Sequence, residues 1–264
     1  MSRNVFGQLT RSPRRLLRAA AGLALAGALS VQAAGAARAE PLEMFELRRM
    51  LTAEEHKAWK GVGRVNVANF SERGMCTGTL IAPDLVLTAA HCVISERTGE
   101  VYPPGNVHFA AGWRMGVGVG HSRAKSIAVH PAYDYRGVVD LARIGSDVAL
   151  IRLALPIPDE AASAFPIGPA ALARSRLTLI SYRRDRAHAL TRQEGCDLKG
   201  IRNGVMALGC DVTFGASGSP LFAEIDGEVR VVAVISAMSA IGAQPIAWAV
   251  AVDAALPEVL AILD

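Results

Sequence analysis

From about Gly61 onward, the chain consists of short apolar runs separated by glycine, proline, asparagine and aspartate. Runs of this length, bounded by turn-forming residues, predict β-strands rather than helices. Strands are expected at residues 65–70, 79–81, 85–88, 107–110, 126–129, 148–153, 176–182, 205–208, 220–223, 229–235 and 247–252. Many short strands at turn-spaced intervals are typical of β-barrels or a sandwich. The pattern therefore predicts an all-β protein, with one short helix over residues 254–263.

A proline-rich segment divides this strand-rich region into two blocks. It spans residues 156–168 and predicts a linker between a first block at 58–155 and a second block at 169–264. Residues 40–57 precede the first block and are charged and helix-like, with a predicted capping box from Thr52 to Glu55. This piece is either a pro-segment or an N-terminal arm, and the sequence pattern is compatible with both.

The first 39 residues have the pattern of an export signal. Arg14–Arg18 supply the positive end, an alanine-rich apolar stretch follows, and Ala37–Ala39 match the small-residue cleavage pattern. A membrane anchor is the alternative, but the apolar stretch is only weakly hydrophobic. The pair Arg14-Arg15 also fits twin-arginine export, although the ordinary secretory route is favoured. A periplasmic or secreted protein that begins at Glu40 and has no stable membrane insertion is expected.

Net charge gives no reason to expect a nucleic-acid partner. The 264 residues carry a formal charge of +4 and have a pI near 9.1. The leader holds six of the 28 basic residues and none of the 24 acidic ones, which leaves 22 basic against 24 acidic residues, a net charge of −2. No stripe of aromatic and basic residues occurs in the sequence either. With 51% hydrophobic residues, the chain can bury the core of one domain or two small ones.

Four cysteines in an exported chain predict two disulfide bonds, for which three pairings exist. The local pairing is expected, Cys76 with Cys92 and Cys196 with Cys210. The first bond closes a loop that contributes about 3 kcal/mol in the chain-entropy description. A zinc site is the competing interpretation, but no Cys-x-x-Cys pair exists. No metal and no cofactor are therefore expected.

Three residue types suited to acyl transfer occur in the order histidine, aspartate, serine. Ser217 lies between two glycines on a predicted turn, His91 ends an apolar strand, and Asp147 opens another. A serine becomes a strong nucleophile when a histidine held by a buried carboxylate accepts its proton. We therefore expect His91, Asp147 and Ser217 to be catalytic. Other aspartates are weaker candidates because their settings are turn-like or less apolar: Asp84, Asp134 and Asp140.

The turn around Ser217 also suggests where negative charge would be stabilised. Gly215 allows a close approach of the backbone to a substrate, and Gly218 frees the turn after the serine. The backbone amides of Gly215 and Ser217 are expected to form an oxyanion hole. An ordinary Gly-Ser turn is the plain alternative, which the two other motifs make less favourable.

Three segments resemble the trypsin/chymotrypsin-like serine protease family. They are CTGTLIAPDLVLTAAHC at Cys76–Cys92, DVALIRL at Asp147–Leu153, and GASGSP at Gly215–Pro220. The resemblance covers about residues 60–252. It implies two perpendicular six-stranded β-barrels, the first with His91 and Asp147 and the second with Ser217. It also implies a serine endopeptidase that hydrolyses peptide bonds of peptides or proteins through an acyl-enzyme, without a cofactor.

Two departures from the family pattern concern activation. Animal digestive members have an aspartate where this chain has Ala216, and that aspartate pairs with a newly cut N-terminus. No Ile-Val-Gly-Gly start exists here either, so this activation switch is not expected. The form GASGSP is similar to bacterial secreted members, including the glutamyl endopeptidase-like branch.

Asp211, Ser236 and Met238 are the expected substrate-binding residues. Asp211 lies six residues before Ser217, where trypsin-like members keep the acid that binds lysine or arginine. The usual cysteine between them is Thr213 here, so Asp211 alternatively satisfies a turn. Residues 236–238 resemble the strand that pairs with the substrate backbone. Glutamyl-type members place a histidine in the wall of the substrate pocket. Because this chain has no histidine after His188, a preference for glutamate is less favoured.

Two other functions share this sequence pattern. The first is a catalytically silent protease homologue that acts as a binding protein, and the second is an esterase with the same triad. Because all three triad residue types are present, the endopeptidase is the favoured function. The sequence makes no prediction about the oligomeric state or about calcium binding.

Overall fold

The computed structural model describes residues 48–68, 73–173 and 177–263. The expected export signal and residues 40–47 lie outside the described residues. Within the described ranges, every helix is too short or too polar to cross a lipid bilayer. The described residues all belong to one compact unit.

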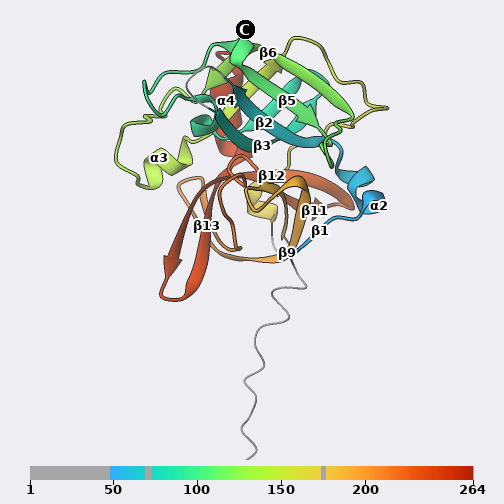
Figure 1. The fold of residues 1–264 in the computed structure, drawn as a ribbon. Helices are drawn as coiled ribbons and strands as arrows, with labels where there is room; N and C mark the ends of the chain where they lie inside the picture. Colours follow the sequence, from blue (N-terminus) through green and yellow to red (C-terminus); the bar gives the residue numbers. More distant parts are fainter. Residues whose placement is uncertain (1–47, 69–72, 174–176, 264) are drawn as a thin grey trace, which may run out of the picture. The chain divides into compact units, whose positions relative to one another are not determined.

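Six antiparallel strands close the first barrel, in the order β2-β3-β4-β7-β6-β5 (Figure 1). Apolar side chains alternate along these strands and fill the barrel interior, among them Val65, Leu80, Phe109 and Ile151. The strands are β2 (Val62–Ala68), β3 (Arg73–Ala82), β4 (Leu85–Thr88), β5 (Val107–Ala111), β6 (Gly120–Val129) and β7 (Ala149–Leu153). Closure leaves none of the six described strands of this barrel with a free edge.

The second half is a ring of six strands in the order β9-β10-β13-β12-β11-β8, closed by pairing between β8 and β9. A seventh strand, β1 (Arg48–Met50), pairs with the outer edge of β9. The ring consists of β8 (Leu177–Arg183), β9 (Arg186–Arg202), β10 (Val205–Gly209), β11 (Pro220–Ile225), β12 (Glu228–Ile241) and β13 (Gln244–Ala251). The helix α4 (Val252–Leu260) follows β13. The expected all-β fold of two barrels with a short C-terminal helix is confirmed.

The remaining helices are short and lie in the connections. They are α2 (Ala53–His56), η1 (Lys57–Trp59), η2 (Ala90–Val93), η3 (Pro104–Asn106), α3 (Leu141–Gly145) and η4 (Ala170–Leu172). The predicted capping box at the start of α2 is present. The Thr52 hydroxyl accepts a hydrogen bond from the Glu55 backbone N–H, and the Glu55 carboxylate accepts one from the Thr52 backbone N–H.

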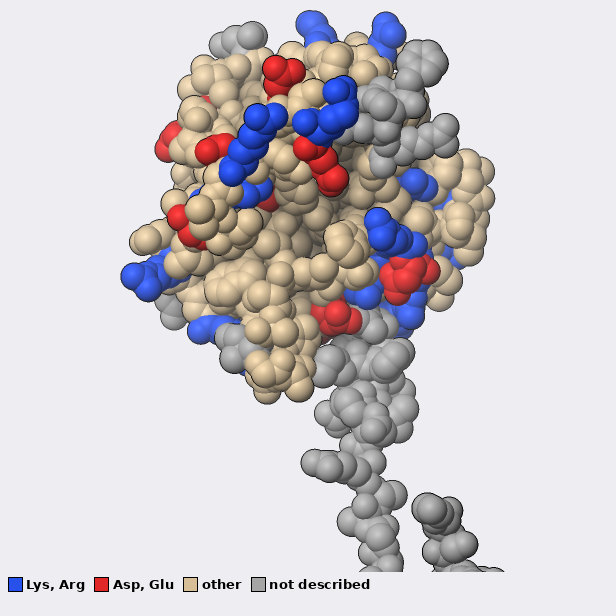
Figure 2. Space-filling view, turned by 60° about the vertical axis from the view of Figure 1, so that its left-hand side comes forward, with Lys and Arg blue, Asp and Glu red and all other residues tan. Residues whose placement is uncertain are grey.

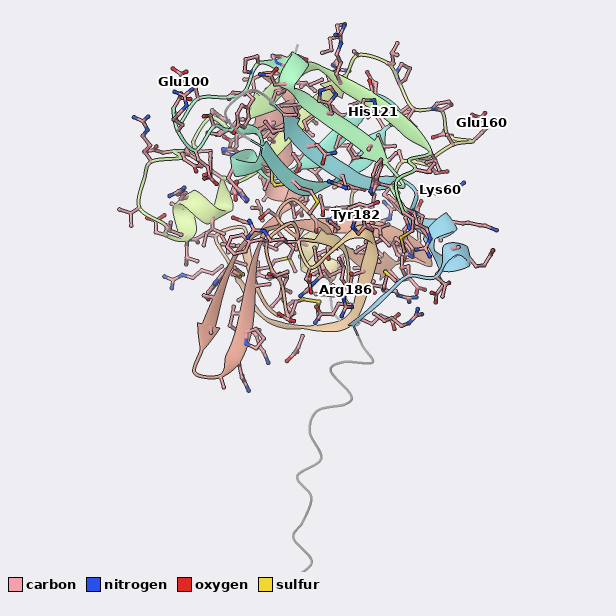
Figure 3. The ribbon with its side chains drawn as sticks, in the orientation of Figure 1. Lys60, Glu100, His121, Glu160, Tyr182 and Arg186 are labelled. Atoms are coloured by element: carbon pink, nitrogen blue, oxygen red, sulfur yellow. A yellow bond between two sulfur atoms is a disulfide. The ribbon has the colours of Figure 1, made fainter. Side chains whose placement is uncertain are left out.

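An apolar cluster between the two barrels fixes their contact. Leu87 and Val148 from the first barrel pack in this cluster with Phe222 and Tyr182 from the second. Tyr182 is fully buried where the barrels meet (Figure 3), and its hydroxyl donates a 2.7 Å hydrogen bond to the Trp113 carbonyl. Because packed interiors resist displacement, loops that border this seam keep a constant geometry.

The described part of the N-terminal piece is built into this seam. Leu51 has no exposed surface and belongs to the cluster between the barrels. Its N–H donates to the Leu190 carbonyl at 2.9 Å, and its carbonyl accepts from Nη1 of Arg114 at 3.0 Å. Residues from Arg48 onward thus contact both barrels. We expect them to behave as a structural arm rather than as a removable pro-segment.

Replacement of Leu51 by alanine should lower the free energy of unfolding by about 2–5 kcal/mol, because a buried side chain is removed and a cavity remains. Urea denaturation of the protein that begins at Glu40 measures this change. Met50→Ala is the matched control, since the neighbouring Met50, the last residue of β1, is 41% exposed. It should shift stability by no more than about 0.5 kcal/mol. Equal effects of the two variants would show that the arm is not packed as described.

Candidate active site

The loop between β10 and β11 carries Ser217 on a backbone that requires glycine on both sides. Gly215 has φ of 91° and Gly218 has φ of 76°, a region that side chains disfavour. A Cβ atom on Gly218 would lie 2.3 Å from the Thr77 carbonyl oxygen, and one on Gly215 would lie 3.0 Å from the backbone nitrogen of Arg184. Close packing therefore requires glycine at 218, and the backbone angle favours glycine at both positions.

Hydrogen bonds to four carbonyl groups fix the loop. Thr77 on β3 donates from its N–H to the Ser217 carbonyl and from its hydroxyl to the Gly215 carbonyl, both at 2.9 Å. The Arg184 N–H donates to the Phe214 carbonyl at 2.7 Å, and a turn bond at 3.0 Å occupies the Ala216 carbonyl. The loop is thus attached both to the first barrel and to the β8–β9 turn.

Two backbone amides of this loop remain free. A trans peptide directs its C=O and the following N–H in opposite directions. The bonds to the Phe214 and Ala216 carbonyls therefore turn the N–H groups of Gly215 and Ser217 away from those partners. Within residues 48–68, 73–173 and 177–263, neither of these two amides donates a hydrogen bond. They provide two donors for a ligand atom.

His91 and Asp147 are directly hydrogen-bonded. Nδ1 of His91, in η2, lies 2.7 Å from Oδ2 of Asp147, and the His91 N–H donates to Oδ1 at 2.9 Å. The Ser236 hydroxyl donates to Oδ2 at 2.5 Å. Asp147 precedes β7 and is 3% exposed, so these bonds offset the cost of burying its charge. Because its partner is a carboxylate, Nδ1 is assigned the proton, which leaves Nε2 as an acceptor.

The other aspartates considered from the sequence have different partners. Asp84 pairs with Arg152 at 2.8 Å. Asp134 and Asp140 each accept a hydrogen bond from a backbone N–H two or three residues further along, and Asp140 in this way caps α3. Of the four candidates, Asp147 is the one that contacts the histidine.

Burial and charge act in opposite directions on His91. Burial lowers the pKa of its imidazole, since the charged form loses solvation. The charge of Asp147 and the hydrogen bond to it raise the pKa by more than this, so the pKa of His91 lies above its ordinary value of 6.5. The carboxylate thus makes the imidazole a stronger base than an isolated histidine.

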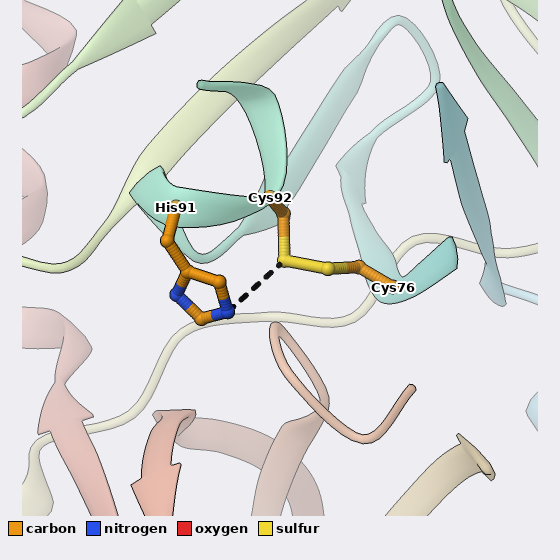
Figure 4. A group of neighbouring side chains, drawn as sticks. All are labelled: Cys76, His91 and Cys92. Atoms are coloured by element: carbon orange, nitrogen blue, oxygen red, sulfur yellow. Dashed lines mark hydrogen bonds between the residues drawn. A yellow bond between two sulfur atoms is a disulfide. The ribbon is translucent and has the colours of Figure 1, made fainter. Parts of the chain in front are cut away.

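His91 and Ser217 line one cleft of about 1770 Å³ whose walls come from both barrels. No hydrogen bond joins their side chains among the described residues. Nε2 of His91 lies 3.8 Å from Sγ of Cys92 (Figure 4). Bonds between a nucleophile and its base are often long without substrate and tighten in the complex.

On the face that Figure 2 shows, acidic and basic side chains are interspersed and do not gather into a patch of one sign (Figure 2).

Both disulfide bonds join the expected pairs, Cys76 with Cys92 and Cys196 with Cys210. Ligand atoms of Cys76, His91 and Cys92 lie within 4.8 Å of one another, as a zinc site would require. However, Figure 4 shows the two sulfurs bonded to each other. A disulfide sulfur is not a thiolate, so this group does not form a zinc site.

Asp211 contacts Arg183 in the structure. Nη1 of Arg183 donates to the Asp211 carbonyl at 3.0 Å, and Nη2 lies 3.8 Å from its Oδ2. Arg183 is only 6% exposed, and a buried cation requires a nearby counter-charge. Asp211 is not among the residues that line the cleft. The expectation of an acid at the floor of the substrate pocket is therefore not supported by this arrangement.

Ser236 and Met238 do line the cleft, as expected. Met238 is 47% exposed there. The hydrogen bond from the Ser236 hydroxyl to Asp147 was not anticipated from the sequence. A serine that precedes an alanine in an apolar strand carries no local signal of such a contact, because Asp147 is distant in the chain.

Replacement of Asp147 by asparagine should lower the pKa of His91 below 6.5, because burial then acts without the opposing charge. A pH titration of the imidazole resonances by NMR measures the change. Asp84→Asn is the matched control and should leave the pKa of His91 unaltered. A pKa that stays above 6.5 in Asp147→Asn would contradict the assigned pair.

The same pair should make stability depend on pH. Because the pKa of His91 is higher in the folded than in the unfolded state, its contribution is fully present below pH 6.5. The contribution is lost as the pH rises through the folded-state value. The difference in unfolding free energy between the wild type and Asp147→Asn should therefore decrease over that interval.

Comparison with known proteins assigns the family. The family model of the trypsin-like peptidase domain matches residues 76–234, which is more than half of the chain. A Glu endopeptidase solved in complex with MPD superposes with a TM-score of 0.65 at 18% identity, over 81% of this chain and 95% of that one. The thermostable serine protease AL20 from an extremophilic microorganism gives 0.62 at 16% identity, over 77% and 96%.

Protease Anisep from Arthrobacter nicotinovorans also has a TM-score of 0.62, at 13% identity, over 81% of this chain and 99% of that one. At these identities the three structures show a shared fold. The family model, together with the double-barrel fold, shows that the chain belongs to the trypsin-like peptidase family, the trypsin/chymotrypsin-like serine proteases.

Proposed function

We propose that this protein is an exported serine endopeptidase with His91, Asp147 and Ser217 as its catalytic triad. The observation that carries the proposal is the 2.7 Å contact between Nδ1 of His91 and Oδ2 of Asp147, beside a cleft that Ser217 also lines. This arrangement supports peptide-bond hydrolysis because it gives a serine hydroxyl a base with a raised pKa.

The reaction begins when Oγ of Ser217 attacks the carbonyl carbon of a peptide bond. Nε2 of His91 takes the hydroxyl proton, and the Asp147 carboxylate stabilises the imidazolium that forms. The imidazolium then returns the proton to the leaving amine, which yields an acyl-enzyme. Water then attacks the acyl carbon, with His91 again as the base. The ester bond to Ser217 breaks, the imidazolium returns the proton to Oγ, and the carboxylic acid product leaves.

We assign the amides of Gly215 and Ser217, which donate no hydrogen bond among the described residues, to the oxyanion hole. In the tetrahedral intermediate, the carbonyl oxygen of the substrate carries negative charge. Two N–H donors of residues that line the cleft would stabilise this charge, and loss of one such donor typically costs about 3–4 kcal/mol of barrier. The turn bonds at the Phe214 and Ala216 carbonyls support this assignment.

The cleft favours an apolar side chain on the residue whose carbonyl is attacked. Val212, Ile235 and Met238 line the cleft together with Ser217, and the Asp211 carboxylate lies 3.8 Å from Nη2 of Arg183. Strand residues 236–238 would pair with the substrate backbone. We therefore propose a preference for uncharged apolar residues over lysine or arginine at this position.

Export agrees with the disulfide bonds of the folded part. Disulfide bonds persist in oxidising compartments such as the periplasm and the exterior of the cell. Together with the leader that ends in Ala37–Ala39, they support secretion or a periplasmic location, with Glu40 as the first mature residue.

Replacement of Ser217 by alanine should reduce turnover of a peptide substrate by about 10⁴–10⁶-fold, because the nucleophile is removed. A fluorophosphonate probe should label the wild type and not the variant. Ser219→Ala is the matched control, since Ser219 lies in the same loop with its side chain fully buried. The probe should still label Ser217 in the Ser219→Ala variant.

Failure of the wild type to react with the probe, together with no hydrolysis of a peptide library, would contradict the enzyme. That outcome would favour the alternative of a catalytically silent homologue that binds a protein partner. Labelling that moves to Ser219, or that survives in Ser217→Ala, would remove Ser217 from the mechanism.

A further inference from the structure

We propose that Arg183 is a positioning residue that holds the oxyanion loop of this enzyme in its active arrangement. The inference rests on the proposed function and concerns how the loop is kept in place. Ala216 in this loop is buried and uncharged, so a charged attachment in addition to the four hydrogen bonds has to come from another residue.

Arg183 makes an unusual set of contacts for a buried arginine. It is the last residue of β8 and lies opposite Arg186 across the two-residue turn to β9; Figure 3 labels Arg186 in the second barrel. Its Nε donates to the exposed carboxylate of Asp185 at 3.2 Å. Its two Nη atoms approach the carbonyl and the carboxylate of Asp211, at 3.0 and 3.8 Å. One guanidinium group therefore joins the turn to the segment that leads into Ser217.

The turn held by Arg183 also orients the amide of Gly215. The next residue, Arg184, donates its N–H to the Phe214 carbonyl at 2.7 Å, and its guanidinium lies over the Phe214 ring at 4.8 Å from the centroid. Because the peptide is planar, the direction of the Phe214 carbonyl sets the direction of the Gly215 N–H. A movement of the β8–β9 turn would therefore rotate one of the two oxyanion donors.

The segment from Asp211 to Ser217 is thus held on two sides. Thr77 from the first barrel binds the Gly215 and Ser217 carbonyls. Arg183 holds the beginning of the segment at Asp211, and the neighbouring Arg184 N–H holds Phe214. Without the guanidinium group, the carbonyl and the carboxylate of Asp211 would lose their contacts to the β8–β9 turn. Asp211 then serves the loop and not the side chain of a substrate.

The central test compares Arg183→Met with Arg183→Lys. The methionine variant should lose about 10²–10³-fold in kcat, the effect typical of a lost oxyanion donor, with little change in KM. Binding of a peptide boronate, which forms a tetrahedral adduct at the serine, should weaken in parallel with kcat/KM. Lysine keeps the charge, so Arg183→Lys should retain more kcat than Arg183→Met. A merely structural role would change stability without this separation of kcat from KM.

Asp211→Asn distinguishes loop positioning from substrate selection. The proposal predicts that kcat falls by a similar factor for substrates with apolar, lysine and arginine side chains at the cleaved bond. A loss confined to lysine and arginine substrates would show that Asp211 binds the substrate, and it would overturn the proposal.

Two further variants keep the result interpretable. Arg183→Met/Asp211→Asn removes both charges, so the Asp211 carboxylate is not left behind without its Arg183 contact, and the kcat of this variant should be as low as that of Arg183→Met. Arg152→Met removes an arginine–aspartate pair outside the cleft and should leave kcat unchanged.

Wild-type kcat in the folded double variant would overturn the role of Arg183 and leave the triad intact. A wild type that neither hydrolyses peptides nor reacts with a fluorophosphonate would overturn the proposed function, and this inference with it.

Discussion

One buried threonine connects the parts from which the site is built. Thr77 has no exposed surface, and its hydroxyl lies between the Gly215 carbonyl, to which it donates, and the Tyr182 N–H, from which it accepts. Its own carbonyl accepts from the Thr88 hydroxyl at 2.8 Å. Buried polar groups must be paired, so strand β3 and the serine loop can only be packed against each other in this register. The position of Ser217 relative to the histidine of the first barrel follows from that requirement.

Buried charge imposes a second constraint. Asp147 and Arg183 are both almost inaccessible, and each is surrounded by partners from other segments. Asp147 collects donors from η2 and from β12, whereas Arg183 reaches the segment before Ser217. Asp147 orients the imidazole ring of His91, and Arg183 orients the backbone that leads into Ser217. The protein thus uses its costliest buried groups at the points where geometry matters for the proposed chemistry.

Local patterns in the sequence predicted most of the architecture. Strands with a strong apolar content, such as β4 and β7, were expected close to their observed positions. Strand β9 was not expected, because its seventeen residues mix buried and exposed positions without a clean alternation. Strand β1 has three residues and no pattern of its own, and it exists because β9 offers an edge. Both are products of tertiary pairing rather than of local preference.

The site shows the same difference between features that local sequence patterns predict and features that arise from tertiary contacts. His91, Asp147 and Ser217 were found from motifs that surround them, and the two disulfide pairs from their spacing. The partner of Asp211 was not found, since Arg183 lies 28 positions upstream in a stretch of several arginines. Which of these arginines becomes buried depends on the turn between β8 and β9. A single sequence contains no signal for that choice.

The placement of β1 has a consequence for the order in which the molecule matures. Its three residues leave the ribosome before any other described strand, yet their partner, β9, is synthesised long afterwards. Until β9 is present, Leu51 has no apolar cluster to pack into, so an incomplete chain exposes this apolar side chain near its N-terminal part. Nascent or truncated copies that stop short of β9 should consequently be preferred clients of chaperones and proteases, and full-length copies should escape them.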